Sequence, residues 1–144
     1  MVAPSRHQDS RGFAPAVRAR PLPRRHQRSR RKGVRTPPGL IYVGRPTVFG
    51  NPFQYRGFGH ARGVALYRLW IDRRLGAITL GRLGFSAAEI DALARWRWRL
   101  DRELPRLFGR DLQCWCPLTS RWCHADILIA YAARMEIAWN GWLQ

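Results

Sequence analysis

The predicted fold depends most on one segment, DLQCWC at residues 111–116. We predict that this segment forms a strand, in which side chains alternate and Cys114 and Cys116 therefore lie on the same face. After a short loop, a final helix begins at residue 123 or 124. Its apolar residues recur at spacings of three and four, which is typical of a helix with one buried face. They are Leu128, Tyr131, Ala132, Met135 and Trp139.

Three further elements are predicted before this segment. Residues 40–43, with sequence LIYV, read as a short buried strand that ends at Gly44. One helix is predicted over residues 62–75, and a second from the capping box at residues 86–89 to about residue 104. The order strand, helix, helix, strand, helix predicts a small, compact, single-domain α/β fold with a short, parallel sheet flanked by helices.

Residues 1–38 have the composition of an arginine- and proline-rich arm. They hold 11 basic side chains, one acidic side chain and six prolines. Such a segment buries too little apolar surface to offset the entropy cost of ordering it. We therefore predict that residues 1–38 are disordered and that the α/β domain occupies residues 39–144. A nucleic-acid-binding arm, a solvated tail and translated sequence upstream of a later start are all open interpretations.

The composition limits the class of protein. Apolar residues make up 46% of the 144 residues, enough for one domain with a core. No apolar run reaches the roughly 18 residues of a membrane span, and the basic N-terminus lacks the apolar segment of a secretory signal. Three clustered cysteines do not make a disulfide framework, so a reduced, cytoplasmic setting is expected. The net charge of +17 favours anionic partners, although 25 of the 26 basic residues are arginine, as a GC-rich coding region would produce.

The densest group of reactive side chains comprises Cys114, Cys116, Cys123 and His124. Thiolates and imidazoles are zinc ligands, and four of them would close a tetrahedral structural site. Zinc sites usually place two to four residues between paired cysteines, whereas one residue separates Cys114 from Cys116. Zinc is therefore one interpretation of the cluster, and a set of small buried apolar groups is another.

A third interpretation makes Cys123 a reactive thiolate. At a helix N-terminus, free backbone N–H groups and the helix dipole favour negative charge, so the pKa of Cys123 is expected to be lowered, and the same geometry would hold a phosphate. His124 would be the proton partner of the thiolate, and Asp126 would be an orienting or capping carboxylate. In this interpretation all three are catalytic residues.

The loop after the first strand supplies groups that suit the same chemistry. Arg45 has a forked guanidinium suited to phosphate or carboxylate, Asn51 is an amide, and Gly44 allows close approach of the backbone. Both motif loops follow strands, and parallel strands place their carboxyl ends at one sheet edge. We therefore expect these three residues to lie beside Cys114 and Cys116 and to bind a ligand with them.

A basic and aromatic stretch, RWRWR, occupies residues 95–99. Such a pattern could stack nucleic-acid bases. On a helix, however, Trp96 and Trp98 point well apart, and Arg97 falls within the apolar stripe. We therefore favour tryptophans that flank a core face and solvated arginines, with Arg97 either extending along apolar surface to water or reaching the anion site.

Four short motifs together resemble a known family. They are GRP at residues 44–46, NPF at 51–53, CWC at 114–116 and CHAD at 123–126. In this combination they resemble the domain-of-unknown-function family DUF4326 of bacterial and phage proteins, over about residues 40–133. The resemblance implies no activity. It implies signature positions at Arg45, Asn51, Cys114, Cys116, Cys123, His124 and Asp126.

Two functions from different classes follow. In the first, a nucleotide-like or phosphorylated small molecule binds at the Cys/His–Arg pocket, and a thiol-dependent reaction would take place there. In the second, the chain is a non-enzymatic nucleic-acid-associated protein in which zinc staples the domain and residues 1–38 contact phosphates. No membrane partner is expected. The expected location is the bacterial cytoplasm, or the host cytoplasm for a phage-encoded chain.

Overall fold

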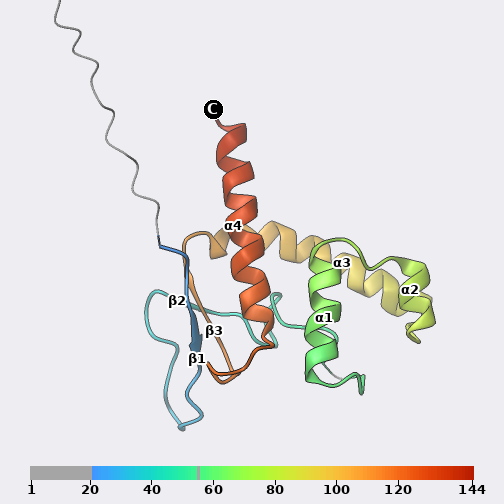
Figure 1. Ribbon diagram of the computed structural model, residues 1–144, viewed down its shortest axis with the longest axis horizontal. Helices are drawn as coiled ribbons and strands as arrows, with labels where there is room; N and C mark the ends of the chain where they lie inside the picture. Colours follow the sequence, from blue (N-terminus) through green and yellow to red (C-terminus); the bar gives the residue numbers. More distant parts are fainter. Residues whose placement is uncertain (1–20, 55) are drawn as a thin grey trace, which may run out of the picture.

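Three short parallel strands form a sheet in the order β1-β3-β2 (Figure 1). The computed structural model describes residues 21–54 and 56–144. The central strand pairs with both neighbours, so that Gln113 lies opposite His26 on one side and opposite Tyr42 on the other. Because all three strands are parallel, their carboxyl ends meet at one edge. The strands are β1 (Arg25–Gln27), β2 (Leu40–Tyr42) and β3 (Asp111–Cys114).

β1 lies inside the segment that the sequence predicts to be a disordered arm, and that prediction is wrong for Arg25–Gln27. Polar contacts order this strand, which has no apolar side chain to bury. Its backbone pairs with β3, and the Asp111 carboxylate accepts the Arg24 backbone N–H at 2.9 Å and lies 2.8 Å from His26 Nε2. The folded part of the chain therefore begins before residue 39. Residues 1–20 of the predicted arm lie outside the described residues.

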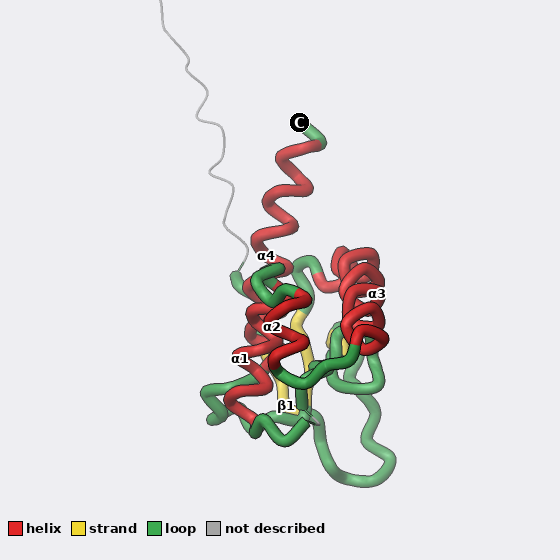
Figure 2. The backbone as a smooth tube through the Cα atoms, turned by 90° about the vertical axis from the view of Figure 1, so that its right-hand side faces the viewer, coloured by secondary structure: helices red, strands yellow, loops and turns green. Residues whose placement is uncertain are grey.

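Helices flank the sheet, as the sequence predicts. α4 packs against β3, α1 packs against α4, and α2 packs against α3 (Figures 1 and 2). No helix in the described ranges is long and apolar enough to cross a membrane. The elements are α1 (His60–Ile71), α2 (Ala77–Arg82), α3 (Ala87–Glu103), the 3-10 helix η1 (Leu104–Leu107) and α4 (His124–Trp142).

Local sequence signals account for some of the helix ends and miss others. The capping box starts α3 as predicted, because the Ser86 hydroxyl accepts the Glu89 backbone N–H and the Glu89 carboxylate accepts the Ser86 N–H at 2.7 Å. The helix predicted over 62–75 stops earlier, at Ile71, and Arg73 takes a positive φ of 58°. α2 escapes prediction because its six residues bury only Leu80, which leaves no apolar period to read.

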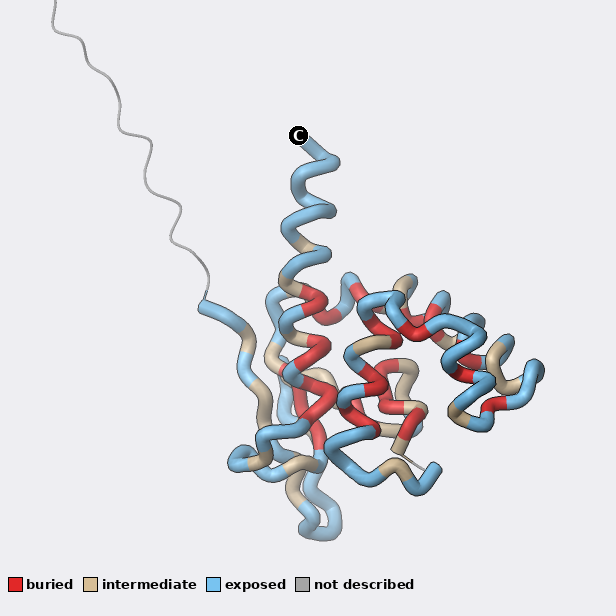
Figure 3. The backbone as a smooth tube through the Cα atoms, turned by 45° about the vertical axis from the view of Figure 1, so that its right-hand side comes forward, coloured by how far each residue is buried: buried red, intermediate tan, exposed pale blue. Residues whose placement is uncertain are grey.

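The first half of α4 lies in the core, and the second half projects from it (Figure 3). Leu128 and Tyr131 are buried, whereas Met135 and Trp139, the last members of the predicted apolar stripe, are exposed. The terminal Trp142 is 90% exposed. The apolar period thus predicts the helix correctly but overstates how much of it is covered.

Arg97 ties three helices together from inside the core. Its side chain is 6% exposed and donates to the carbonyls of Trp70 (3.3 Å) and Ile71 (2.7 Å), in the last turn of α1. It also donates to the Tyr131 hydroxyl on α4 at 2.9 Å and forms an ion pair with Asp101 one turn along α3. Arg97 therefore neither reaches water nor reaches an anion site, and both of its predicted roles are wrong.

Candidate functional site

The three cysteines come together where β3 passes into α4. Cys114 is the last residue of β3, Cys116 follows in the loop, and Cys123 is the N-cap residue of α4. Their sulfur atoms all lie within 4.8 Å of one another, and the Cys114 and Cys123 sulfurs are 3.1 Å apart. Cys114 and Cys123 are buried, whereas Cys116 is half-buried. The turn between strand and helix thus gathers three soft donor atoms at one point.

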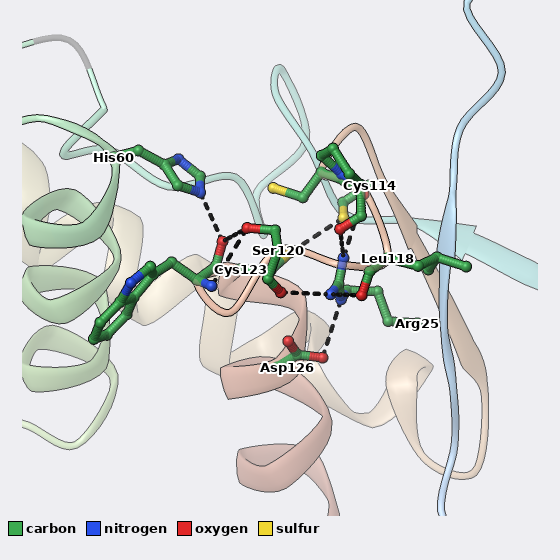
Figure 4. A network of polar contacts seen from close by, with 10 residues as sticks. Arg25, His60, Cys114, Leu118, Ser120, Cys123 and Asp126 are labelled. Atoms are coloured by element: carbon green, nitrogen blue, oxygen red, sulfur yellow. Dashed lines mark hydrogen bonds and ion pairs between the residues drawn. The ribbon is translucent and has the colours of Figure 1, made fainter.

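The guanidinium of Arg25 holds this turn in shape (Figure 4). It donates to the carbonyl oxygens of Pro117 at 3.0 Å and Ser120 at 3.1 Å, with longer contacts to Cys116 and Leu118 at 3.3 and 3.4 Å. The side chain is only 8% exposed. An irregular turn has no secondary structure to satisfy its carbonyls, so a single buried cation from β1 organises the segment that carries Cys116.

Asp126 binds Arg25 on the other side. Its Oδ1 lies 3.1 Å from Arg25 Nε, and the carboxylate is half-exposed at the first turn of α4. Asp126 is therefore connected to the turn through Arg25. The sequence instead predicts that Asp126 would orient or cap the cysteine and histidine. No sequence motif marks Arg25, because only the pairing of β1 with β3 brings it to the site.

His124 lies in the core beside the cysteines. Its Nε2 is 2.8 Å from the Val43 carbonyl oxygen, and its ring meets the Tyr67 ring edge-on at 5.5 Å. Burial lowers the pKa of His124, so the ring is neutral and Nε2 carries the proton that it donates to Val43. Among the described residues, the group of ligand atoms within 4.8 Å of one another contains the three cysteines without His124. The predicted four-ligand set is therefore not assembled.

Hydrogen bonding within the cluster favours the thiolate form of Cys114. Contacts with the sulfur atoms of Cys116 and Cys123 hold the pKa of Cys114 well below its usual value. The same bonds, with burial, raise the pKa of Cys123. The helix N-terminus does favour a Cys123 thiolate through the Ala125 N–H, but that effect is the smaller one. The expected lowering of the Cys123 pKa is thus wrong, because the sequence does not reveal which sulfur accepts.

A cavity of about 240 Å³ opens beside the cluster, at the carboxyl ends of β2 and β3. The loop after β2 and the loop after β3 both line it, so the predicted convergence of the two motif loops is confirmed. Its wall combines a cation with two sulfur atoms. The lining residues are Tyr42, Gly44, Arg45, Asn51, Gln54, Cys114, Trp115, Cys116 and His124.

The polar groups of the first loop have different roles in this wall. Arg45 Nη2 donates to Gln54 Oε1 at 3.0 Å, and burial lowers the pKa of Arg45 while leaving it a cation at neutral pH. Both ends of the Asn51 amide bind backbone groups, because its nitrogen donates to the Gly63 carbonyl at 3.1 Å and its oxygen accepts the Phe53 N–H at 2.9 Å. Arg45 can therefore face a ligand, while Asn51 ties the loop to α1.

A wider cavity of about 410 Å³ adjoins the first one. The two share Trp115 and Cys116, and the second adds Arg30, His60 and Ser120. His60 Nε2 lies 2.6 Å from the Trp122 carbonyl oxygen, so the start of α1 closes over the turn before α4 (Figure 4). Cys116 thus stands between two adjoining hollows, and it is the most exposed of the three thiols.

A family model described as "Domain of unknown function (DUF4326)" matches residues 26–134. The chain belongs to the DUF4326 family. No curated protein and no solved structure matches this chain.

The DUF4326 region extends further toward the N-terminus than the motifs indicate. It starts within β1, whereas the motif resemblance begins near residue 40. It includes the three cysteines and the loop after β2, and it ends before the projecting end of α4. The family region therefore contains every residue that lines the cavity at the sheet edge, and the exposed C-terminal turns of α4 lie outside it.

Proposed function

We propose that this DUF4326 chain binds a small phosphorylated molecule in the cavity between Arg45 and the cysteine cluster. One observation carries the proposal: the Arg45 guanidinium and the sulfurs of Cys114 and Cys116 line the same hollow at the carboxyl ends of two parallel strands. Open α/β sheets bind their ligands at this edge. A guanidinium recognises a phosphate through two parallel hydrogen bonds.

The size of the hollow indicates how such a ligand would lie. A cavity of about 240 Å³ is smaller than most sites for drug-sized ligands, which start near roughly 300 Å³. It suits a phosphate group with a few further atoms. A nucleotide would continue past Trp115 and Cys116 into the adjoining hollow, where Arg30 and His60 supply polar contacts. Any thiol-dependent reaction at this site would use Cys114 as its thiolate, in place of Cys123.

Titration calorimetry with inorganic phosphate and with adenosine diphosphate tests the proposal. Arg45→Gln removes the cation and keeps a polar side chain, so we expect at least a tenfold loss of affinity, in line with the removal of one charged hydrogen-bonding partner. Arg110→Gln is the matched control, because Arg110 is exposed and lines none of the cavities described above. Equal binding by both variants would refute the assignment of Arg45.

A second candidate, a soft metal ion held by the three thiolates, is favoured by the mutual distance of the sulfurs. With Zn–S bonds of about 2.3 Å, three thiolates around one ion lie roughly 3.8 Å apart, which requires the Cys114–Cys123 pair to open slightly from 3.1 Å. Cys114 and Cys116 line the cavity, so a fourth coordination position would face Arg45. A zinc ion so held would polarise a ligand placed in that position.

Metal analysis of the purified full chain separates the two candidates. One equivalent of zinc in the wild-type chain, lost in Cys114→Ser and Cys116→Ser, would establish the metal site. A metal-free chain that still binds adenosine diphosphate would establish the phosphate site without it. Absence of both zinc and phosphate binding would leave the cysteines as core residues and refute both candidates.

A further inference from the structure

A basic surface lies along one face of α3 and continues into η1. Three arginines recur along α3 at spacings of four and three, which places them on one helix face, and a fourth follows in η1. This face borders a groove of about 560 Å³ whose opposite wall comes from β2 and the loop that follows it. The four are Arg95, Arg99, Arg102 and Arg106, of which the last three line the groove.

The charge of this groove is largely uncompensated. Glu103 is the one carboxylate in its lining, and it pairs with Arg106 at 2.8 Å. Within residues 21–54 and 56–144, no carboxylate lies within ion-pair distance of Arg99 or Arg102. Two cations on the groove wall therefore have no carboxylate partner among the described residues, in a chain whose net charge is already +17.

An aromatic face accompanies these cations. Trp98 is 60% exposed in the groove lining, and the Arg102 guanidinium stands 4.8 Å from the centre of its ring. Its neighbours in the RWRWR stretch are used internally: Trp96 donates to the Val48 carbonyl at 2.6 Å, and Arg97 is buried. Trp96 thus flanks the core, in line with the interpretation of the two tryptophans. Packing in the fold does not explain why Trp98 is exposed.

We propose that this groove binds single-stranded nucleic acid, with Arg99 and Arg102 on the phosphates and Trp98 stacked on a base. Phosphodiester strands supply the regularly spaced negative charge that an arginine stripe recognises, and unpaired bases supply the flat surface that an indole covers. An acidic peptide would match the charge but has no flat ring to place on Trp98. A duplex keeps its bases stacked on each other, so it cannot offer one to Trp98 without unpairing.

The test measures binding of the full chain to a fluorescently labelled oligonucleotide by anisotropy, at several salt concentrations. Arg99→Gln/Arg102→Gln is compared with Arg74→Gln/Arg82→Gln, which removes the same charge from exposed positions after α1 and at the end of α2. We expect the groove variant to lose roughly tenfold or more in affinity, and the slope of log K against log salt to fall by about 1.4, at about 0.7 per phosphate contact. The control should change by less than about twofold, apart from the general effect of net charge.

The aromatic contact has its own variants. Trp98→Ala should weaken binding by about fivefold or more, Trp98→Phe should restore most of it, and Trp142→Ala, which removes an exposed indole from α4, should leave it unchanged. Several results would overturn the proposal: equal losses in the two arginine variants, tighter binding of a duplex than of a single strand, competition by polyglutamate as strong as by the unlabelled strand, or no binding at low salt. Circular dichroism of each variant confirms that the fold is kept.

Discussion

Two buried arginines stabilise two different regions of the molecule, and the carbonyl groups that they bind belong to different kinds of structure. Arg97 joins α1, α3 and α4, and the carbonyls that it binds end a regular helix. Arg25 joins β1 to the turn before α4, and the carbonyls that it binds belong to a segment with no secondary structure. The same guanidinium chemistry therefore stabilises the fold in one region and shapes the candidate site in the other.

This difference predicts how each region responds to the loss of its arginine. Without Arg97, the helices that pack on each other lose a shared partner deep in the core, so the whole domain should become less stable. Without Arg25, the three helices keep their contacts and the cysteine turn loses its support. Global unfolding and local opening should thus separate cleanly between the two variants.

Arg97→Met should cause the largest loss in the free energy of unfolding. Removing the cation leaves two α1 carbonyls without this donor, while Asp101 keeps Arg73 and the Tyr131 hydroxyl as partners. Loss of a buried charged hydrogen-bonding partner costs about 3 kcal/mol. Urea unfolding measures this free energy. Arg95→Met on the exposed face of the same helix is the control and should stay within about 0.5 kcal/mol of the wild type. Equal stability of the two variants would show that Arg97 does not hold the helices.

Arg25→Met should have a smaller and more local effect. We expect a loss of about 1–3 kcal/mol, and faster amide hydrogen exchange in residues 116–122, while exchange in α1 and α3 stays the same. Arg24→Met is the control, since Arg24 is exposed and its hydrogen bonds with β3 and Asp111 come from its backbone. Faster exchange across the whole domain would contradict the local role of Arg25.

The smallest effect concerns the pairing of β1 with β3 in acid. A backbone hydrogen bond from Arg24 and a contact with His26 hold the pKa of Asp111 below its usual value. A carboxyl group whose pKa is lower in the folded state stabilises that state above the unfolded pKa of about 4. This stabilisation is lost as the pH falls further, through the folded pKa. Exchange of the Arg28 amide, which donates to the Cys114 carbonyl, should therefore rise below about pH 4.

The Asp111→Asn variant provides the comparison for this pH effect. Its amide cannot ionise, so the exchange of the Arg28 amide should be faster than in the wild type at pH 7 and should show little further change in acid. A wild-type chain whose Arg28 amide exchanges at a rate independent of pH, after correction for intrinsic chemistry, would rule out Asp111 as the anchor of β1.

The sequence predicts those parts of the fold that depend on apolar period and local hydrogen bonding. β2, α3 and α4 fall where the patterns indicate, and two parallel strands bring Arg45 to the cysteines. β3 does so only as far as Cys114, and Cys116, which the sequence predicts to lie in the strand, follows it in the loop. The sequence does not predict β1, because its residues are polar and its stability comes from a partner strand 85 or more positions away. No local pattern carries that information.

In the candidate site, too, the sequence predicts some features and not others. Which residues gather there follows from motif spacing and strand direction, so Arg45, Cys114 and Cys116 could be placed together. What each side chain does depends on partners that the fold brings in. His124 binds the Val43 carbonyl, Asn51 forms hydrogen bonds with Gly63 and Phe53, and Asp126 binds an arginine from β1. Neither the acceptor role of Cys114 nor the position of Arg25 can be read from the residue types.

Alkylation of Cys116 tests most directly whether the cavity between Arg45 and the cysteines is a binding site. Cys116 is the most exposed thiol and lines both hollows, so at alkaline pH, where its thiol ionises in spite of its raised pKa, iodoacetamide with peptide mass mapping should modify it fastest and Cys123 slowest. We predict that adenosine diphosphate slows the modification of Cys116 in the wild type and in Arg110→Gln, and has no effect in Arg45→Gln. Modification that the nucleotide leaves unchanged in the wild type, or slows equally in Arg45→Gln, would contradict the account.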